Sequence, residues 1–273
     1  NGGAGVSVRA KAVGVFEGCE VHGNRTHGFD IASGGNPSLI DTKVHNNAVG
    51  VKVYDSGRGT MLNCEVSGNK SYGVEVTTEG HPCAVHTQVE RNGASGILVA
   101  ELGAGDFDQC TVSNNKMHGI EIREGCDPSV RVTSFGRNKR SGIFIAQGGR
   151  GMYEQCKMVG NQKGVNVRAG GEPVMRFMRC LNNTKKNFKI SSEAGGVFEH
   201  CGLKKCSGNH DGRIIENSRS IGGFKSLSGM LLEQLSGRRN VGDCVGKMNT
   251  LSDEAVTDCR SKVGNAQLNN WLL

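Results

Sequence analysis

The stretch GRGTMLNCEVSGN (residues 57–69) returns along the chain as GAGDFDQCTVSNN (residues 103–115) and GRGMYEQCKMVGN (residues 149–161). Recurrence at a fixed spacing means that the fold rebuilds one physical environment many times, so the repeat has to be explained before any single motif. Each copy ends on an asparagine of a series that advances by 22 or 23 residues: Asn24, Asn47, Asn69, Asn92, Asn115, Asn138, Asn161 and Asn183.

A glycine follows most of these asparagines, and an alternating apolar pair such as Val74 and Val76 follows the glycine. Period-two alternation of β-branched residues is typical of a half-buried strand. A unit this short has no room for a helix, so it fits a coil that rises by one strand spacing, about 4.8 Å, per turn. Leucine-rich repeats share the period, but their leucine pattern and helical segment are missing. The sequence predicts a right-handed parallel β-helix, an all-β single-stranded solenoid of about nine turns, over residues 1–206.

Successive units alternate between two types. One type carries an aromatic residue or methionine three places before Cys19, Cys64, Cys110, Cys156 and Cys201, and these cysteines recur every 45 or 46 residues. The other type carries a proline followed five residues later by Thr42, Thr87 or Thr133 in three of its copies. In register, these cysteines and threonines form one column, which we expect to point inward.

Two turns separate successive cysteines of this column, about 9.6 Å, whereas a disulfide requires Cα atoms within about 7 Å. The chain has 11 cysteines but no C-x-x-C motif and no zinc-type clustering. We interpret the column as structural thiols and predict neither a metal site nor a cofactor. Unpaired cysteines in this number favour an intracellular reducing compartment, cytoplasmic or organellar.

The chain of 273 residues has a formal net charge of +7 and no apolar run near the ~20 residues of a membrane span. It opens on Asn1-Gly-Gly, already within the repeat, so an N-terminal part is expected to be missing or removed. Residues 207–273 lose the repeat, and helical spacing of apolar residues begins at Phe224. We expect either a small helical C-terminal cap over the last turn or a partner-binding extension that ends in Trp271-Leu-Leu.

Turns of the form Gly34-Gly35-Asn36-Pro37 alternate with turns of the form Gly57-Arg58-Gly59, and N-x-x-x-G-[VI]-x-[VI] recurs between them. This pattern resembles the β-helix repeats of carbohydrate-binding and sugar-hydrolase type, and within that group the repeats of F-box-only protein eleven. The resemblance implies the pectate-lyase-like coil and its use as a surface that recognises protein substrates. The F-box and the zinc module of that family are missing, so its ligase role is not implied.

Catalysis on sugars by such a coil requires carboxylates that converge on one face within about 5–10 Å. The candidate acids lie two residues before the cysteines, as Glu17, Asp108, Glu154 and Glu199, with Leu62 interrupting the series. An acid in most units is typical of a solvated structural column, so we assign no catalytic residue from the sequence.

Two surface features remain. Turns after the asparagines carry Lys70, Lys116, Lys139, Arg140 and Lys163, which predict a basic edge able to follow an acidic polymer or an acidic protein surface. Leu98 and Phe144 are large apolar residues at outward positions that are otherwise polar, as expected for a partner contact. Few aromatic residues interleave with the basic ones, so no specific nucleic-acid binding is expected.

The leading hypothesis from the sequence is a non-enzymatic scaffold, a rigid β-helix that holds a partner protein in a larger assembly. The alternative is a carbohydrate-active β-helix, either a binding module or a lyase, hydrolase or epimerase that acts on an acidic polysaccharide.

Overall fold

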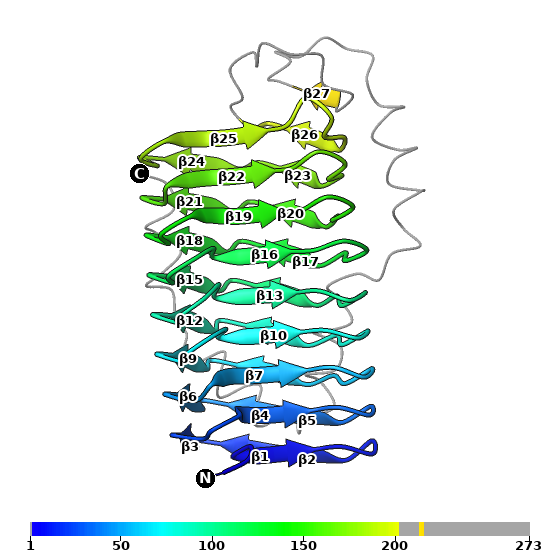
Figure 1. Cartoon of the computed structure of the whole chain (residues 1–273), viewed down its shortest axis with the longest axis vertical. Helices are drawn as coiled ribbons and strands as arrows, with labels where there is room; N and C mark the ends of the chain where they lie inside the picture. The colour runs from blue at the N-terminus through cyan, green and yellow to red at the C-terminus, as the bar shows by residue number, and fades with distance from the viewer. Residues whose placement is uncertain (1, 202–212, 216–273) are drawn as a thin grey trace, which may run out of the picture. The chain divides into compact units, whose positions relative to one another are not determined.

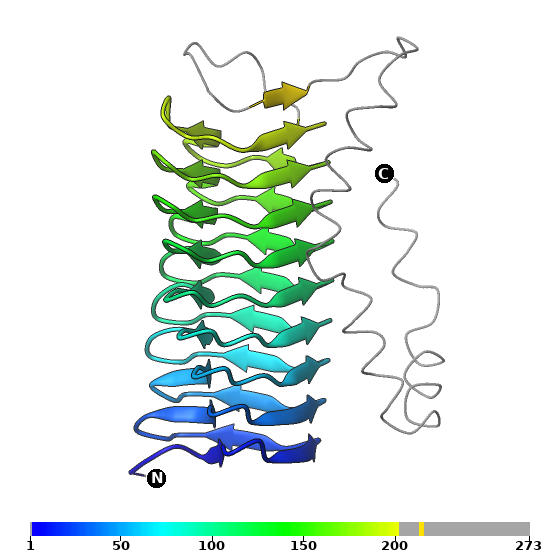
Figure 2. The ribbon, with the colours of Figure 1, turned by 90° about the vertical axis from the view of Figure 1, so that its right-hand side faces the viewer.

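A computed structural model describes residues 2–201 and 213–215 of the chain. Short strands are stacked into three parallel sheets, A, B and C, and the chain visits them in the order A, B, C in every turn (Figures 1 and 2). Sheet C has eight strands, so the coil completes eight turns, and β25 and β26 begin a ninth in sheets A and B. The prediction of a right-handed parallel β-helix is confirmed.

Sheet A contains β1 (Val6–Val8), β4 (His27–Ile31), β7 (Val49–Val53), β10 (Val74–Val76), β13 (Ile97–Val99), β16 (Ile120–Ile122), β19 (Ser141–Ile145), β22 (Lys163–Val167) and β25 (Lys186–Ile190). Sheet B contains β2 (Val13–Glu17), β5 (Asn36–Ile40), β8 (Thr60–Leu62), β11 (Cys83–Val85), β14 (Asp106–Asp108), β17 (Ser129–Arg131), β20 (Met152–Glu154), β23 (Val174–Arg176), β26 (Val197–Glu199) and β27 (Arg213–Ile215). Sheet C contains β3 (Glu20–His22), β6 (Lys43–His45), β9 (Glu65–Ser67), β12 (Gln88–Glu90), β15 (Thr111–Ser113), β18 (Ser134–Gly136), β21 (Lys157–Val159) and β24 (Arg179–Leu181).

The last described strand, β27, pairs in parallel with β26 and so extends sheet B into the segment for which the sequence predicts a cap. The predicted helices after Phe224 and the terminal Trp271 lie outside the described residues. Within the described ranges, no helix has the length and hydropathy needed to cross a membrane.

The asparagine series forms a continuous ladder of hydrogen bonds between sheets C and A. Asn92 is fully buried, and its Nδ2 donates to Asn115 Oδ1 at 3.0 Å and to the carbonyl of Val66 at 3.3 Å. Its Oδ1 accepts from the backbone N–H of Asn69 at 3.0 Å. The left-handed backbone lies one residue earlier, at Arg91 (φ 55°) in this turn, so the side chain of the ladder asparagine rather than its backbone freedom closes the corner.

The column of cysteines and threonines lies in the core, where Cys64, Thr87 and Cys110 are at most 2 % exposed. The Thr87 hydroxyl donates to the carbonyl of Val85, and the Cys110 thiol lies 3.3 Å from the carbonyl of Asp108, so each hydrogen-bonds to the strand that precedes it. Burial raises the pKa of Cys64 to about 11 and that of Cys110 to about 12, so both remain protonated and poorly nucleophilic at neutral pH.

Candidate functional site

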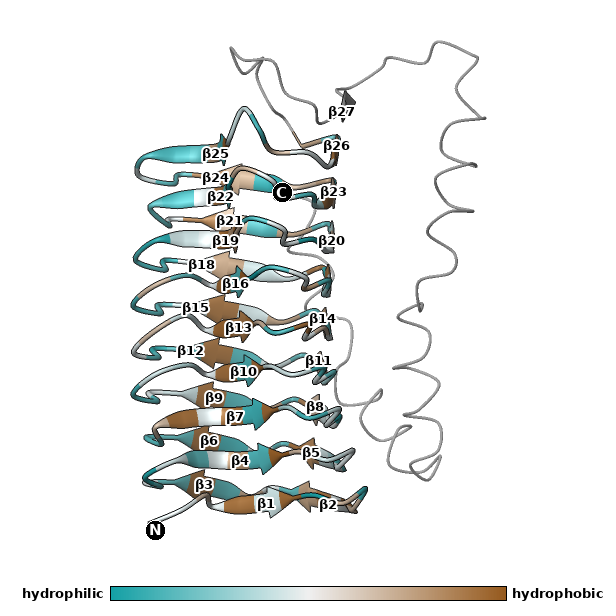
Figure 3. Cartoon of the chain, turned by 45° about the vertical axis from the view of Figure 1, so that its right-hand side comes forward, coloured by the Kyte–Doolittle hydropathy of each residue, from teal (hydrophilic) through white to brown (hydrophobic). Residues whose placement is uncertain are grey.

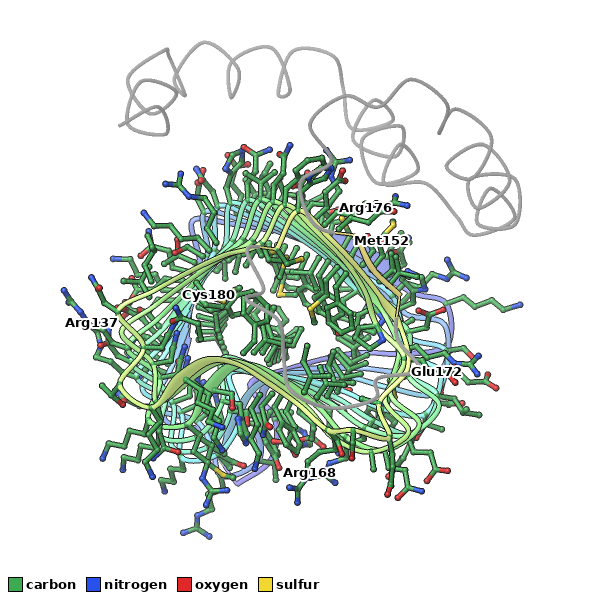
Figure 4. The ribbon with its side chains drawn as sticks, turned by 90° about the horizontal axis from the view of Figure 1, so that it is seen from above. Arg137, Met152, Arg168, Glu172, Arg176 and Cys180 are labelled. Carbon is green, nitrogen blue, oxygen red and sulfur yellow. The ribbon has the colours of Figure 1, made fainter. Side chains whose placement is uncertain are left out.

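The outer face of sheet B carries the predicted acidic column. Strand pairing places the column in the order Glu17, Ile40, Leu62, Val85, Asp108, Arg131, Glu154, Arg176 and Glu199. Arginines therefore separate the last three acids, and Arg176 Nε donates to Glu199 Oε2 at 2.6 Å. Figure 4 shows Met152 and Arg176 pointing outward from this sheet and Cys180 pointing into the coil. Glu154 and Glu199 thus belong to a ladder in which acids and arginines alternate from strand to strand.

The structure brings Asp108 together with an acid that does not belong to the predicted column. Asp106 and Asp108 flank the buried Phe107 on β14, so both side chains lie on the outer face of sheet B. Residues two apart on a strand are separated by about 6.6–6.8 Å along the strand axis. Inverting glycosidases hold their two carboxyl groups about 6.5–9.5 Å apart, and two acids that leave one sheet face at this backbone spacing are compatible with the lower end of that range.

Asp106 is held by a histidine from the turn that precedes β11. His81 Nε2 lies 3.2 Å from Asp106 Oδ2, and both side chains are less than one third exposed. An imidazole that donates a hydrogen bond at this distance holds the carboxylate in one orientation.

Asp108 has a different environment from Asp106. Burial raises the pKa of Asp108, and the neighbouring Arg131, Gln109 and His86 only partly oppose that effect. Its Oδ1 is buried without a hydrogen-bond partner in the described part of the chain, and the same holds for Ser129 Oγ on the next strand. Asp106 pairs directly with Ser129 in the sheet register. The two unpartnered oxygens, Asp108 Oδ1 and Ser129 Oγ, therefore lie close to the Asp106 carboxylate on the same face of sheet B.

Two carboxyl groups in unlike environments are the arrangement used to separate an acid from a base. Asp108 is the group that burial biases toward the protonated form, and Asp106 is the group paired with an imidazole. Below them, Cys83 and Val85 present a less polar surface, because they are paired with Asp106 and Asp108 respectively. The site is therefore suited to proton donation beside a less polar area that can contact the hydrophobic side of a ligand.

Sequence reasoning included Asp108 but missed Asp106, His81, Ser129 and Arg131. A signal was present in the stretch D-F-D, because β14 alone among the described strands of sheet B has an acid at both outward positions. His81 gave no comparable signal, since the turn between sheets A and B decides which strand it reaches.

The predicted basic edge follows the turns between sheets C and A. The backbone N–H groups of Lys70, Lys116 and Lys139 donate to the carbonyls of Asn47, Asn92 and Asn115, each one turn earlier. These three lysines and Arg140 are exposed, whereas Lys163 is half-buried at the start of β22. The geometry thus places the members of the edge in register along the coil axis.

Leu98 and Phe144 lie on the outer face of sheet A, as predicted, in the paired order Glu75, Leu98, Glu121 and Phe144. Leu98 is only 4 % exposed, so the prediction of an exposed apolar patch at this residue is wrong. Its neighbours in the sheet register are Glu75 and Glu121. Phe144 is half-buried and its ring stacks on His118, with 4.5 Å between ring centroids.

Comparisons with known proteins agree with this architecture. Among solved structures, the Agl-KA catalytic domain matches with a TM-score of 0.54 and 11% identity, over 77% of this chain and 54% of that chain. The pectate lyase Pel9A matches with a TM-score of 0.46 and 14% identity, over 64% of this chain and 53% of that chain. The chain thus spans about half the length of these two structures. No curated protein matches the sequence.

A family described as right handed beta helix region matches residues 1–131 and 102–226. The two matches together span most of the chain, and the parallel pairing of all three sheets agrees with them. The chain belongs to this family of right-handed β-helix proteins.

Proposed function

We propose that this protein is a carbohydrate-active enzyme that hydrolyses a glycosidic bond on the outer face of sheet B. The proposal rests on one observation, the pair of Asp106 and Asp108 on a single strand with unlike surroundings. The similar structures share only the fold with this chain, and the fold does not indicate a reaction, because one β-helix architecture supports many functions.

In the proposed reaction, Asp108 is the general acid. It transfers its proton to the glycosidic oxygen as the bond between that oxygen and the anomeric carbon breaks. Its raised pKa keeps it protonated to a higher pH than an exposed aspartate. Arg131, which lowers the pKa of Asp108, stabilises the carboxylate that remains after the transfer.

Asp106 is the general base. It accepts a proton from a water molecule whose oxygen attacks the anomeric carbon from the face opposite to the leaving group. His81 holds the Asp106 carboxylate during this step. Because water adds as the sugar oxygen leaves, the product sugar has the inverted anomeric configuration, and each carboxyl group returns to its starting state after proton exchange with solvent.

The test compares the full chain with the variants Asp108→Asn and Asp106→Asn on a panel of neutral and acidic polysaccharides. Each variant should lower kcat by about 10²–10⁴-fold, since that is the usual contribution of general acid–base groups. The matched control is Glu17→Gln, which should retain full activity. Glu17 is an exposed acid of the same column, four strands away from β14 in sheet B, and its strand carries neither a histidine nor a second acid.

NMR of the released reducing end gives a second readout. An inverted anomer supports the assignment of acid and base, and a retained anomer contradicts it. The proposal fails if no polysaccharide is cleaved, or if both aspartate variants keep the activity of the parent chain.

The non-enzymatic scaffold is the second candidate, and the regular exposure of Lys70, Lys116 and Lys139 along one edge favours it. Similarity to the repeats of F-box-only protein eleven would fit the same use of the coil. A chain with all three lysines changed to glutamine should lose a stoichiometric partner in native mass spectrometry of the purified assembly. If the partner is retained by this variant, the basic edge does not hold it.

A further inference from the structure

Three consecutive strands of sheet B carry no charged residue. They are β5, β8 and β11, and Figure 3 shows them following one another along one side of the coil up to β14. From β14 to β27, every strand of this sheet in the described ranges has at least one acid or arginine. The strands of sheet B therefore form an uncharged part and a charged part, and β14 lies at the boundary between them.

The uncharged part presents apolar side chains in the column that contains Asp108. Strand pairing places Ile40, Leu62 and Val85 in this column, with Val85 next to Asp108. All three are half-buried, so part of each side chain is open to solvent. On the other side of Asp108 the column continues with Arg131. A group that extends from Asp108 toward the N-terminal end of the coil thus meets an apolar surface, and one that extends the other way meets a cation.

The neighbouring outward column is also uncharged up to β14. Its members are, in register order, Val15, Ser38, Thr60 and Cys83. Val15 is 57 % exposed, and Val13 on the same strand is 75 % exposed. We call the outward residues of β5, β8 and β11, together with these two valines of β2, the uncharged strip. Continuous apolar surface that is open to solvent indicates a contact site. Four strand spacings separate β14 from β2, so the strip is about 19 Å long.

The strip begins where the proposed reaction releases its leaving group. This step rests on the hydrolase proposed above, in which Asp108 gives its proton to the glycosidic oxygen. Val85 is paired with Asp108 one strand spacing away, about 4.8 Å, so a leaving group that extends along the strip lies over Val85. The sugar between Asp106 and Asp108 has polar neighbours instead, because Ser129 and Arg131 are the paired residues on the next strand.

We propose that the substrate of this site is a glycoside of a long-chain alcohol, whose alkyl chain lies along the uncharged strip. Water adds to the anomeric carbon, the bond between that carbon and the glycosidic oxygen breaks, and the alcohol leaves with the proton of Asp108. An alkyl chain needs no hydrogen-bond partner, and each methylene removed from water favours its binding. A sugar in the same place would have its hydroxyls against Val85, Leu62 and Ile40, which offer no hydrogen bonds from their side chains.

The test compares the butyl and the octyl glycosides of glucose, galactose and mannose as substrates of the full chain. Both anomeric forms are used, at concentrations below the critical micelle concentration. The octyl chain reaches farther along the strip than the butyl chain, toward Leu62 on β8. A methylene that is half removed from water contributes about twofold, so the four additional methylenes should raise kcat/KM by about tenfold.

The variant Leu62→Glu places a charge in the strip at a position where the fold accepts one, because Glu154 and Glu199 belong to the same column. It should lower the preference for the octyl glycoside from about tenfold to about twofold or less, with little change for the butyl glycoside. The matched control is Val174→Glu, which adds the same charge to an outward position three strands from β14 on the charged side. It should keep the preference of the parent chain.

Binding to Asp108→Asn by isothermal titration calorimetry separates the chain-length effect from the chemistry, and the octyl glycoside should bind about tenfold more tightly than the butyl glycoside. A parent chain that cleaves no glycoside but shows this difference in binding contradicts the hydrolase and supports the strip as the site of the alkyl chain. Equal kcat/KM for the two chain lengths, or an equal loss of preference in Val174→Glu, overturns the proposed substrate and leaves the hydrolase in place. A parent chain that sediments as a dimer, with Leu62→Glu a monomer, also overturns it, because the strip would then be a contact between two copies.

Discussion

His118 illustrates how an outward side chain becomes part of the packed structure. It lies on the outer face of sheet A but is only 5 % exposed, because it is stacked on Phe144 and its Nδ1 accepts the backbone N–H of Ser141 at 3.2 Å. Burial lowers its pKa to about 4, Glu121 opposes the shift, and Arg140 and Lys163 add to it. The neutral imidazole is therefore the form that the fold requires.

This residue predicts a pH dependence of stability. The folded-state pKa of about 4 lies below the usual value of 6.5, so the unfolded chain binds more protons between these pH values. The contribution of His118 to the free energy of unfolding is complete above pH 6.5 and is lost as the pH falls toward 4, by at most about 3 kcal/mol. His118→Asn keeps an acceptor for the Ser141 N–H but does not titrate.

Chemical denaturation of both chains between pH 7 and pH 4 measures this contribution. As the pH falls from 7 to 4, the unfolding free energy of the parent chain should decrease more than that of His118→Asn. A difference that is constant with pH would mean that His118 does not titrate with folding.

At the scale of elements, the asparagine ladder joins each turn to the next by side chains as well as by the sheets. An interior member such as Asn92 both donates to the following turn and accepts from the preceding one. Asn24 begins the described ladder, and its N–H and Nδ2 both donate to Asn47 Oδ1. The same residue type therefore has a different energetic role at the end of the ladder and in its interior.

Asn92→Ala should destabilise the chain by about 3 kcal/mol, because it leaves the buried N–H of Asn69 without its acceptor. Asn24→Ala removes one side-chain hydrogen bond, while Asn47 Oδ1 still accepts the backbone N–H of residue 24, so the loss should be about 1 kcal/mol. Urea denaturation midpoints compare the two variants. Equal losses of unfolding free energy in the two variants would contradict this expectation, because they would show that the unpaired Asn69 N–H adds nothing to the cost.

At the scale of the described coil, each turn contacts only its neighbours, as in other solenoids. The repeat of two turns, seen as the spacing from Cys64 to Cys110, keeps thiols and threonines in alternation in the core. The proposed hydrolytic pair lies on β14 alone, so the architecture allows the turn that carries it to be removed without the others.

Deletion of residues 65–110 removes one such pair of turns and joins Cys64 to Thr111 in the same register. The shortened chain should fold, with a strand-type circular dichroism spectrum and a cooperative unfolding transition. It should lack hydrolytic activity, since Asp106 and Asp108 are gone. Deletion of residues 65–100 is the control, because it joins Cys64 to Glu101 out of register and should yield an unfolded or aggregated chain.

The sequence by itself determined the period, the parallel coil and the inward column of Cys64, Thr87 and Cys110. These features repeat in every turn or every second turn, so strand spacing alone places like residues above one another. It also placed Asp108 in a column of candidate acids, because the acid belongs to a repeating position, but it assigned that column no catalytic role.

Only the tertiary structure decided which outward residues act together and which are buried. Leu98 stands out in the sequence as an apolar residue at an outward position, but its exposure depends on side chains from adjacent turns. His81 reaches Asp106 across a turn of the coil, and Asn166 keeps an unpartnered buried oxygen among lysines from two strands. Such contacts occur once rather than in every repeat, so the periodicity of the sequence does not predict them. They depend on how the turns between the sheets direct each side chain.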